Sequence, residues 1–346
     1  MKQERILVFT KNWLGDVIFE EPFIRALKRK WESAYIICVT NYRCRDILTA
    51  NPYVDEVIGF DDRKKDKGII AALRLIKLLK EKKITKAFIL HRSFSRALIV
   101  WLASIPERFG YNTKQRGFLL TQPIQEPTQK MHRVDYFLHI LKETLLFIED
   151  SLAYAYSLYY DTGDERFVES LLASHEVTPH SFIAIHPGGN WDKKRWPTAY
   201  FIELINKLNE HYDVPCLITG TSDDDALAKQ IIAGIKGKKP ISLCGKTNII
   251  QLGALFHFAQ FVISADSGPL HIASGVGTPV VALFGPTDAV ITGPRGNGIY
   301  FVLQNLPEQC DIPCFQERCS TSECMKRIKA DDVLNCIKKN TLVKAL

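Results

Sequence analysis

The chain has 346 residues, of which 46% are hydrophobic and 24% are charged, and its formal net charge is +7. This composition is typical of a folded globular protein and excludes a largely disordered chain. The longest apolar runs, such as residues 97–103, fall far short of the ~20 residues of a membrane-spanning helix, and the N-terminus does not read as a signal peptide, so we expect a cytoplasmic protein.

The length also predicts two domains, because a single hydrophobic core stops growing near ~250–300 residues. The positive charge is concentrated in the first half. Residues 1–165 hold 27 Lys/Arg and 21 Asp/Glu, whereas residues 166–346 hold 18 and 17. This excess predicts an anionic partner for the first half, although a solvated basic face would have the same composition. No basic–aromatic array indicates nucleic acid.

From the N-terminus, short apolar segments alternate with amphipathic ones. Strands are predicted at 5–9, 34–40, 54–60 and 86–90, and helices at 22–31, 42–51, 68–83 and 95–104. The pattern weakens between about 120 and 180 and then restarts. The second set of strands is 182–188, 214–220, 240–245, 261–266 and 279–285, with helices at 167–176, 198–212, 223–235, 248–259, 269–277 and 331–346.

Alternation of this kind indicates parallel βαβ units. We therefore predict an α/β protein with two Rossmann-like, doubly wound domains at residues 1–165 and 166–330. Residues 331–346 form a terminal helix, with the option of packing back toward the first domain.

Glycines and charged side chains follow the ends of several predicted strands. In open parallel sheets, ligands bind at the carboxyl ends of the strands. The loop "NWLGDV" follows the first strand; there Gly15 permits close backbone approach, and Asp16 is either a functional carboxylate or a helix cap. In "HPGGNWDKKRWP", Gly188 and Gly189 precede a basic run with Lys194. A Gly pair next to cations suits a phosphate.

Two further strand ends carry polar groups. In "GTSDDDALAK", Asp223, Asp224 and Asp225 either cap a helix or accept hydrogen bonds from ribose hydroxyls. In "ADSGPLH", Asp266 leaves a strand, Ser267 and Gly268 begin a helix, and His271 lies near its first turn. A helix N-terminus with these donors favours a bound phosphate.

In their order along the chain, these motifs resemble glycosyltransferase family 9, the ADP-heptose:lipopolysaccharide heptosyltransferases, and are most similar to its type II members. The matching segments are "NWLGDVI", "NPYVDEVIGFD", "HPGGNWDKKRWP", "DSGPLHIA" and "GTPVVALFGPTD". The resemblance implies the GT-B fold, in which two Rossmann-like domains face a central cleft. The acceptor then belongs mainly to the N-terminal domain and the nucleotide sugar mainly to the C-terminal one.

The resemblance also implies roles for single residues in an inverting transfer that needs no metal. Asp16 matches the general base, Lys194 the lysine that neutralises the donor phosphates, and His271 a donor to the leaving group. Donor binding is expected of Gly15, Gly188, Gly189, Asp224, Asp266, Ser267 and Gly268. Asp224 stands where the family has Glu, and Ser267 where it often has Thr. Arg92, Arg96, Lys114 and Arg116 are acceptor candidates by position and charge.

The resemblance names the partners as well. The donor is ADP-heptose, the acceptor is the lipopolysaccharide inner core (Kdo-lipid A or a heptosylated form), and the enzyme works at the cytoplasmic face of the inner membrane as a peripheral protein. The acidic Kdo sugars and phosphates of such an acceptor fit the basic first half. Another nucleotide sugar, or a non-catalytic binding protein on the same scaffold, remains an alternative.

Four cysteines, Cys310, Cys314, Cys319 and Cys324, cluster near the C-terminus with gaps of three, four and four residues. This spacing is compatible with a structural zinc site. Disulfides are disfavoured in a reducing cytoplasm, and free thiols are the third alternative. A catalytic thiol is not expected, because no His partner stands nearby in the sequence.

Overall fold

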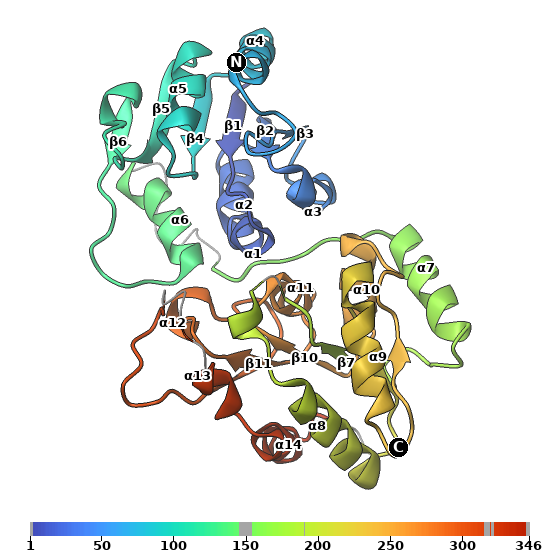
Figure 1. The fold of residues 1–346 in the computed structure, drawn as a ribbon. Coiled ribbons are helices and arrows are strands. Elements are labelled where there is room, and N and C mark those ends of the chain that lie inside the picture. Colours follow the sequence, from blue (N-terminus) through green and yellow to red (C-terminus); the bar gives the residue numbers. More distant parts are fainter. Residues whose placement is uncertain (1–2, 145–153, 190, 315–318, 320–321, 344–346) are drawn as a thin grey trace. The chain divides into compact units, whose positions relative to one another are not determined.

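The computed structural model describes residues 3–144, 154–189, 191–314, 319 and 322–343. The chain divides into two compact units, residues 1–156 and 157–346 (Figure 1). The division lies nine residues before the predicted boundary at 165/166, which falls inside the helix α7 (Thr162–Ala173). Residues 157–161 and this helix therefore belong to the second unit.

The first unit is a six-stranded parallel sheet with the order β3-β2-β1-β4-β5-β6. Its strands are β1 (Arg5–Phe9), β2 (Tyr35–Thr40), β3 (Glu56–Gly59), β4 (Lys86–Ile89), β5 (Glu107–Tyr111) and β6 (Gln122–Ile124). Its helices are α1 (Leu14–Phe19), α2 (Glu21–Lys30), α3 (Arg45–Thr49), α4 (Ile69–Glu81), α5 (Phe94–Leu102) and α6 (Arg133–Glu143). The first strand pairs with both β2 and β4, so the strand order reverses at β1.

Alternate residues of these strands bury opposite faces of the sheet. Leu7 and Phe9 of β1 pack with α4 and α5 on one face, where Leu79 and Val100 are buried. On the other face, Phe23 of α2 meets Phe88 at a ring-centroid distance of 5.4 Å. Both faces are therefore covered, as a parallel sheet requires.

The second unit repeats this arrangement with the order β12-β11-β10-β7-β8-β9. Its strands are β7 (Ile183–His186), β8 (Cys216–Ile218), β9 (Ile241–Ser242), β10 (Phe261–Ala265), β11 (Val280–Phe284) and β12 (Tyr300–Gln304). Its longer helices, besides α7, are α8 (Thr198–His211), α9 (Asp225–Ala233), α10 (Ile249–His257), α11 (Gly268–Gly275) and α14 (Ala330–Lys339). The short helices are α12 (Ala289–Thr292) and α13 (Glu323–Lys326).

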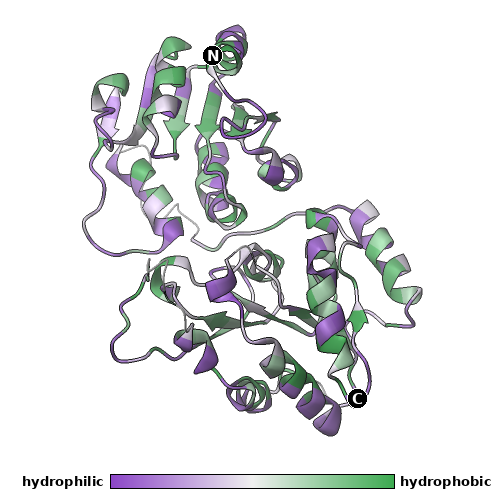
Figure 2. Ribbon diagram, in the orientation of Figure 1, coloured by the Kyte–Doolittle hydropathy of each residue, from purple (hydrophilic) through white to green (hydrophobic). Residues whose placement is uncertain are grey.

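Hydrophobic strands form the interior of each unit, while the helices also carry hydrophilic residues (Figure 2). In the second unit, α8, α9 and α14 bury apolar side chains on one face of the sheet, including Phe201, Ile231 and Ile337. The terminal helix α14 thus contributes to the core of the second unit, where it packs against α8 and β12. No helix in the described part of the chain has the length and apolar character that crossing a bilayer needs.

The predicted α/β class with two Rossmann-like parallel sheets is confirmed. Counted from its own first strand, each sheet has the order 3-2-1-4-5-6, which is the Rossmann order. The strand order reverses between β1 and β4 in the first unit, and between β7 and β10 in the second. These are the points where doubly wound sheets bind ligands.

Candidate functional site

In the second unit, two polar loops leave the sheet side by side. Strands β7 and β10 are parallel neighbours, with His186 in register with Ser264. The loop after β7 carries Gly188, Gly189 and Lys194, and the turn after β10 carries Asp266 and Ser267. The topology therefore brings together motifs that are about 80 residues apart in the sequence.

A charged cluster joins these two loops. The Nζ of Lys194 donates to Oδ2 of Asp266 at 2.7 Å, and Nε2 of His271 lies 3.5 Å from Oδ1 of the same carboxylate. Asp266 and His271 are almost completely buried, whereas the Lys194 side chain is 25% exposed. Three residues predicted to act on the donor phosphates thus form one contiguous group.

Asp266 is ionised in this cluster. Burial alone would raise the pKa of its carboxyl, but a hydrogen bond from His271 and the charge of Lys194 outweigh burial and lower this pKa to about 2. A buried carboxylate with two such partners holds both of them in fixed positions. Asp266 consequently orients the ammonium group and the imidazole.

The helix α11 begins beside this cluster without a side-chain cap. Ser267 is its N-cap residue in an extended conformation, and Gly268 is its first helical residue. The Ser267 hydroxyl lies 3.2 Å from that of Ser264. The first amides of a helix have no intrahelical acceptor and carry positive partial charge, so this end can hold an anion next to Lys194.

The loops after β7 and β8 approach each other closely at Asp224. Its Oδ2 accepts hydrogen bonds from the backbone amide and the hydroxyl of Thr221, both at 2.8 Å. A Cβ atom at Gly188 would lie 2.7 Å from Oδ1 of Asp224, so only glycine allows this close approach. Asp224 thus lies between the two loops, whereas the neighbouring Asp225 pairs with Lys229 at 2.7 Å.

The remaining glycine of this loop is open. Apart from its neighbours in the chain, a Cβ atom at Gly189 would meet none of the described residues within 4 Å. The carbonyl of Gly189 accepts from both Nε and Nη2 of Arg195, at 3.0 and 2.8 Å. Arg195 thus ties the loop together, a role that its position in a basic run did not reveal.

The first unit places Asp16 in the first turn of α1, just after β1. Asp16 and Gly15 are partly exposed. Next to them, the backbone amide of Lys11 donates to Oε1 of Glu20 at 2.9 Å, and burial raises the pKa of Glu20 well above its ordinary value. Glu20 is fully buried, so Asp16 is the carboxyl of this pair that solvent can reach.

An exposed aromatic ring precedes Asp16 on the same loop. Trp13 is 52% exposed, and the guanidinium of Arg43 lies 4.7 Å from its ring centroid. Arg43 is held in turn by Oδ1 of Asn41. The sequence shows Trp13 beside the motif but gives no signal for the stacking of Arg43, which comes from a different strand–helix unit.

Two of the four acceptor candidates are buried, contrary to expectation. Arg96 is 2% exposed, donates to Asp62 at 2.7 Å, and lies over the rings of Phe9 and Phe60. Arg116 is fully buried and donates to the backbone carbonyls of Tyr111, His91 and Ser93. Their guanidinium groups lie in the interior of the first unit, where Nε and Nη1 of Arg96 and Nη2 of Arg116 have no hydrogen-bond partner among the described residues.

The other two acceptor candidates are on the surface. The Arg92 side chain is 46% exposed and pairs with Glu126 at 3.0 Å. Lys114 is exposed and has a positive φ of 52°. Both can reach a ligand, and their predicted role stays a prediction.

None of the four clustered cysteines forms a disulfide within the part of the chain that the structure describes. Burial raises the pKa of Cys324, and the nearby thiols of Cys310 and Cys319 raise it further. Within the part of the chain that the structure describes, no group of three His, Cys, Asp or Glu side chains has an arrangement that could hold a metal ion. Residues 315–318, 320 and 321, which lie between these cysteines in the sequence, are not among the residues that the structure describes.

Comparison with known proteins gives one consistent result. Residues 72–325 match the family model described as glycosyltransferase family 9 (heptosyltransferase). The chain is 27% identical over 305 residues to lipopolysaccharide heptosyltransferase 2 of Salmonella typhimurium, covering 84% of this chain and 85% of that protein. It is 28% identical over 334 residues to lipopolysaccharide heptosyltransferase 3 of Escherichia coli, covering 94% and 96%.

Solved structures agree on the fold. The crystal structure of the family 9 glycosyltransferase from Veillonella parvula matches with a TM-score of 0.87 at 22% identity, covering 99% of this chain and 98% of that one. The GT-B class expected from the motifs is therefore confirmed for the pair of sheets.

Proposed function

The chain belongs to glycosyltransferase family 9, the heptosyltransferases, and from this premise we propose that it transfers heptose from ADP-heptose to the inner core of lipopolysaccharide. The observation that carries the proposal is the group Lys194–Asp266–His271 at the uncapped start of α11. Heptosyltransferases 2 and 3 are about equally similar to this chain. We therefore propose the inner core as the acceptor and assign no particular hydroxyl group.

We assign donor binding to the second unit. The diphosphate accepts hydrogen bonds from the first amides of α11 and from the Ser267 hydroxyl, and it receives the positive charge of Lys194. Gly188 and Gly189 let the phosphates approach the backbone, and Asp224 accepts from the ribose hydroxyls. Gly15 lies in the first unit, and its role in donor binding stays a prediction from the resemblance.

The proposed chemistry is a single displacement without a metal. An acceptor hydroxyl oxygen attacks the anomeric carbon from the face opposite the diphosphate, and Asp16 takes the hydroxyl proton. The bond from the anomeric carbon to the diphosphate oxygen breaks, and its electron pair leaves with ADP. Lys194, His271 and the α11 amides stabilise the charge that builds on this leaving group.

We assign the acceptor to the first unit. Trp13 offers an aromatic face to a sugar ring next to Asp16, and Arg92 and Lys114 offer cations to its acidic groups. An acceptor embedded in lipid implies that the enzyme works at the cytoplasmic face of the inner membrane as a peripheral protein.

The decisive variant is Asp16→Asn, which keeps the size of the side chain and removes its basicity. We expect transfer from ADP-heptose to a heptose-deficient core acceptor to fall at least ~100-fold, within the range of general-base effects. Because Asp16 belongs to the first unit and we assign donor binding to the second, calorimetric affinity for ADP should stay unchanged.

Three results would contradict the proposal. Retained turnover in Asp16→Asn would remove Asp16 from the role of base. Tighter calorimetric binding of UDP or GDP than of ADP to the unaltered protein would point to a different nucleotide sugar. Failure to consume ADP-heptose with any core acceptor would favour a non-catalytic binding protein.

A further inference from the structure

Among the described residues, no further strand pairs with the edge strand β12. It is the last strand of the second sheet and pairs with β11 on one side. Its sequence, YFVLQ, has five residues with neither a charge nor a proline. An edge of this kind presents free backbone donors and acceptors and is a template for a further strand.

The other three sheet edges differ from β12. β9 has only two residues, and β6 has three with Pro123 in the middle. β3 has four, and its Glu56 pairs with Lys82 at 2.6 Å. Short length, proline and charge are the usual means of blocking edge pairing. The chain uses them at three edges and omits them at β12.

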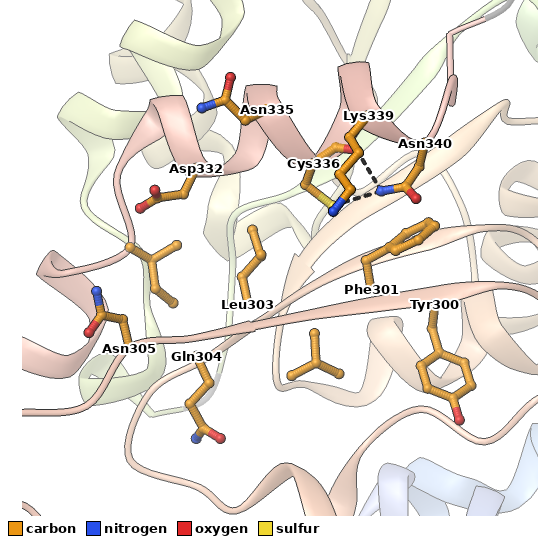
Figure 3. A pocket seen from close by; sticks show the side chains of 12 residues that line it. Tyr300, Phe301, Leu303, Gln304, Asn305, Asp332, Asn335, Cys336, Lys339 and Asn340 are labelled. Carbon is orange, nitrogen blue, oxygen red and sulfur yellow. Dashed lines mark hydrogen bonds between the residues drawn. The ribbon is translucent and has the colours of Figure 1, made fainter.

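A groove of about 710 Å³ runs along this edge, between β12 and α14. Phe301 and Leu303 point toward α14, whereas Tyr300 and Gln304 point to the other side of the strand (Figure 3). Tyr300 and Val302 are 46% and 37% exposed. An apolar, uncharged strand with this exposure fits a partner that pairs through its backbone and covers both faces.

The charges on α14 show which partner fits. Asp332 lies at the Asn305 end of the groove and Lys339 at the Tyr300 end (Figure 3). The two side chains are seven residues apart, close to two helical turns, and so share one face of the helix. Both are exposed. The groove is thus acidic at one end and basic at the other.

We propose that β12 pairs antiparallel with β12 of a second copy of this chain. Such a pair has a two-fold axis through the middle of the strand, near Val302. The two-fold axis places the Asn305 end of one groove next to the Tyr300 end of the other. Asp332 of each copy therefore lies beside Lys339 of the other. The two sheets then continue into each other, and the two α14 helices lie antiparallel on the same face.

The test is the oligomeric state of the full chain, measured by sedimentation equilibrium over a series of concentrations. We expect the unaltered protein to be a dimer. Val302→Lys places two like charges near the axis and should yield a monomer with an unchanged circular dichroism spectrum and unchanged ADP affinity. Lys339→Glu and Asp332→Lys should each raise the dimer dissociation constant at least ~10-fold, a usual size for interface charge pairs.

The double variant Asp332→Lys with Lys339→Glu exchanges the charges and should restore dimerisation. Asp332 also accepts from the backbone amide of Lys329 at the start of α14, so only recovery in the double variant separates pairing from capping. Lys338→Glu is the matched control, because this neighbouring lysine does not line the groove, and it should leave the dimer intact.

Three results would overturn the proposal. If the unaltered protein is monomeric at all concentrations, self-pairing is excluded. This holds even if a different protein is found to bind this edge. A dimer that persists in Val302→Lys would have to use another surface. Failure of the charge exchange to restore dimerisation, while Val302→Lys is monomeric, would exclude the antiparallel register.

Discussion

At the scale of single residues, the second unit is organised around one buried carboxylate. Asp266 is 6% exposed and touches both the ammonium of Lys194 and the imidazole of His271. Removing one partner from a buried ionised group leaves its charge poorly compensated, which is costly. Lys194 should therefore matter for stability before any ligand binds, as well as for the donor.

We predict that Lys194→Ala destabilises the protein at neutral pH and weakens ADP binding. The folded-state pKa of Asp266 is about 2, below the ordinary value near ~3.9, so its interactions stabilise the fold above about pH 4. This stabilisation is lost as the pH falls through about 2. Without Lys194, the pKa of Asp266 rises. The free energy of unfolding at neutral pH should then fall by on the order of 2 kcal/mol or less.

Urea unfolding of both proteins at neutral and acidic pH measures this difference. It should be present at pH 7 and shrink as the pH falls toward 3. Lys246→Ala, at an exposed lysine elsewhere in the same unit, serves as the control and should change neither quantity. A deficit that is independent of pH would mean that Lys194 stabilises the fold without acting through Asp266.

At the scale of elements, the loops to which we assign donor binding are connected through close contacts at glycine residues. Gly188 lies against Asp224, and Gly220 does so too, with a Cβ there meeting the Cβ of Asp224 at 2.7 Å. The loop after β7 and the loop after β8 thus fix the same carboxylate. A change in either loop should reach the ribose contact that we propose for Asp224.

We predict that Gly188→Ala and Gly189→Ala separate folding from ligand binding. Gly188→Ala displaces Asp224, so it should lower the melting temperature and weaken ADP binding together. At Gly189 an added methyl group meets no non-neighbouring residue of the described chain within 4 Å, so the melting temperature should stay unchanged. If the donor phosphates approach this backbone, only the calorimetric affinity for ADP should fall. Unchanged affinity in Gly189→Ala would remove the phosphates from this loop.

The sequence predicted most strands and helices well, because buried parallel strands are apolar runs separated by amphipathic helices. It missed β5, β6 and α6, since β5 contains Glu107, Arg108 and Gly110 and β6 is only three residues long with a proline. It also missed β12, which follows a Gly-rich loop. β5 and β6 lie next to and at a sheet edge, where the hydrophobic signal is weakest.

For the site, motif spacing predicted which residues matter, but not how they meet. The approach of Asp224 to Gly188 joins loops 36 residues apart, and nothing local marks it. Arg96 and Arg116 are acceptor candidates by position and charge, and charged side chains are seldom buried. In the structure, backbone carbonyls, Asp62 and aromatic rings surround their guanidinium groups. Only the folded chain could reveal such partners.

At the scale of the whole molecule, the positive charge belongs to one unit. With the boundary after Tyr156, the first unit holds 27 Lys/Arg and 18 Asp/Glu, a net charge of +9, and the second holds 18 and 20, a net charge of −2. The difference in net charge between the two units is larger than with the predicted boundary after residue 165, because residues 157–165 are acidic. A field of this kind attracts anionic partners and weakens with salt.

We predict that salt acts mainly on the acceptor. From low to high ionic strength, kcat/KM for a phosphorylated core acceptor should fall steeply. The affinity for ADP should fall less, because the second unit has no excess of positive charge. Steady-state kinetics with calorimetry on the same salt series measures both. Equal slopes would mean that the basic first unit is not used to recruit the acceptor.

The repeated strand order has a consequence for how such enzymes diverge. In each unit, the loops that follow its first and fourth strands extend from the middle of the sheet, and sheet pairing does not depend on their length or composition. Mutations that remodel these loops in one unit leave the hydrogen-bonded framework of the other untouched. New acceptor preferences can therefore evolve among descendants of one ancestral gene while nucleotide recognition is inherited unchanged.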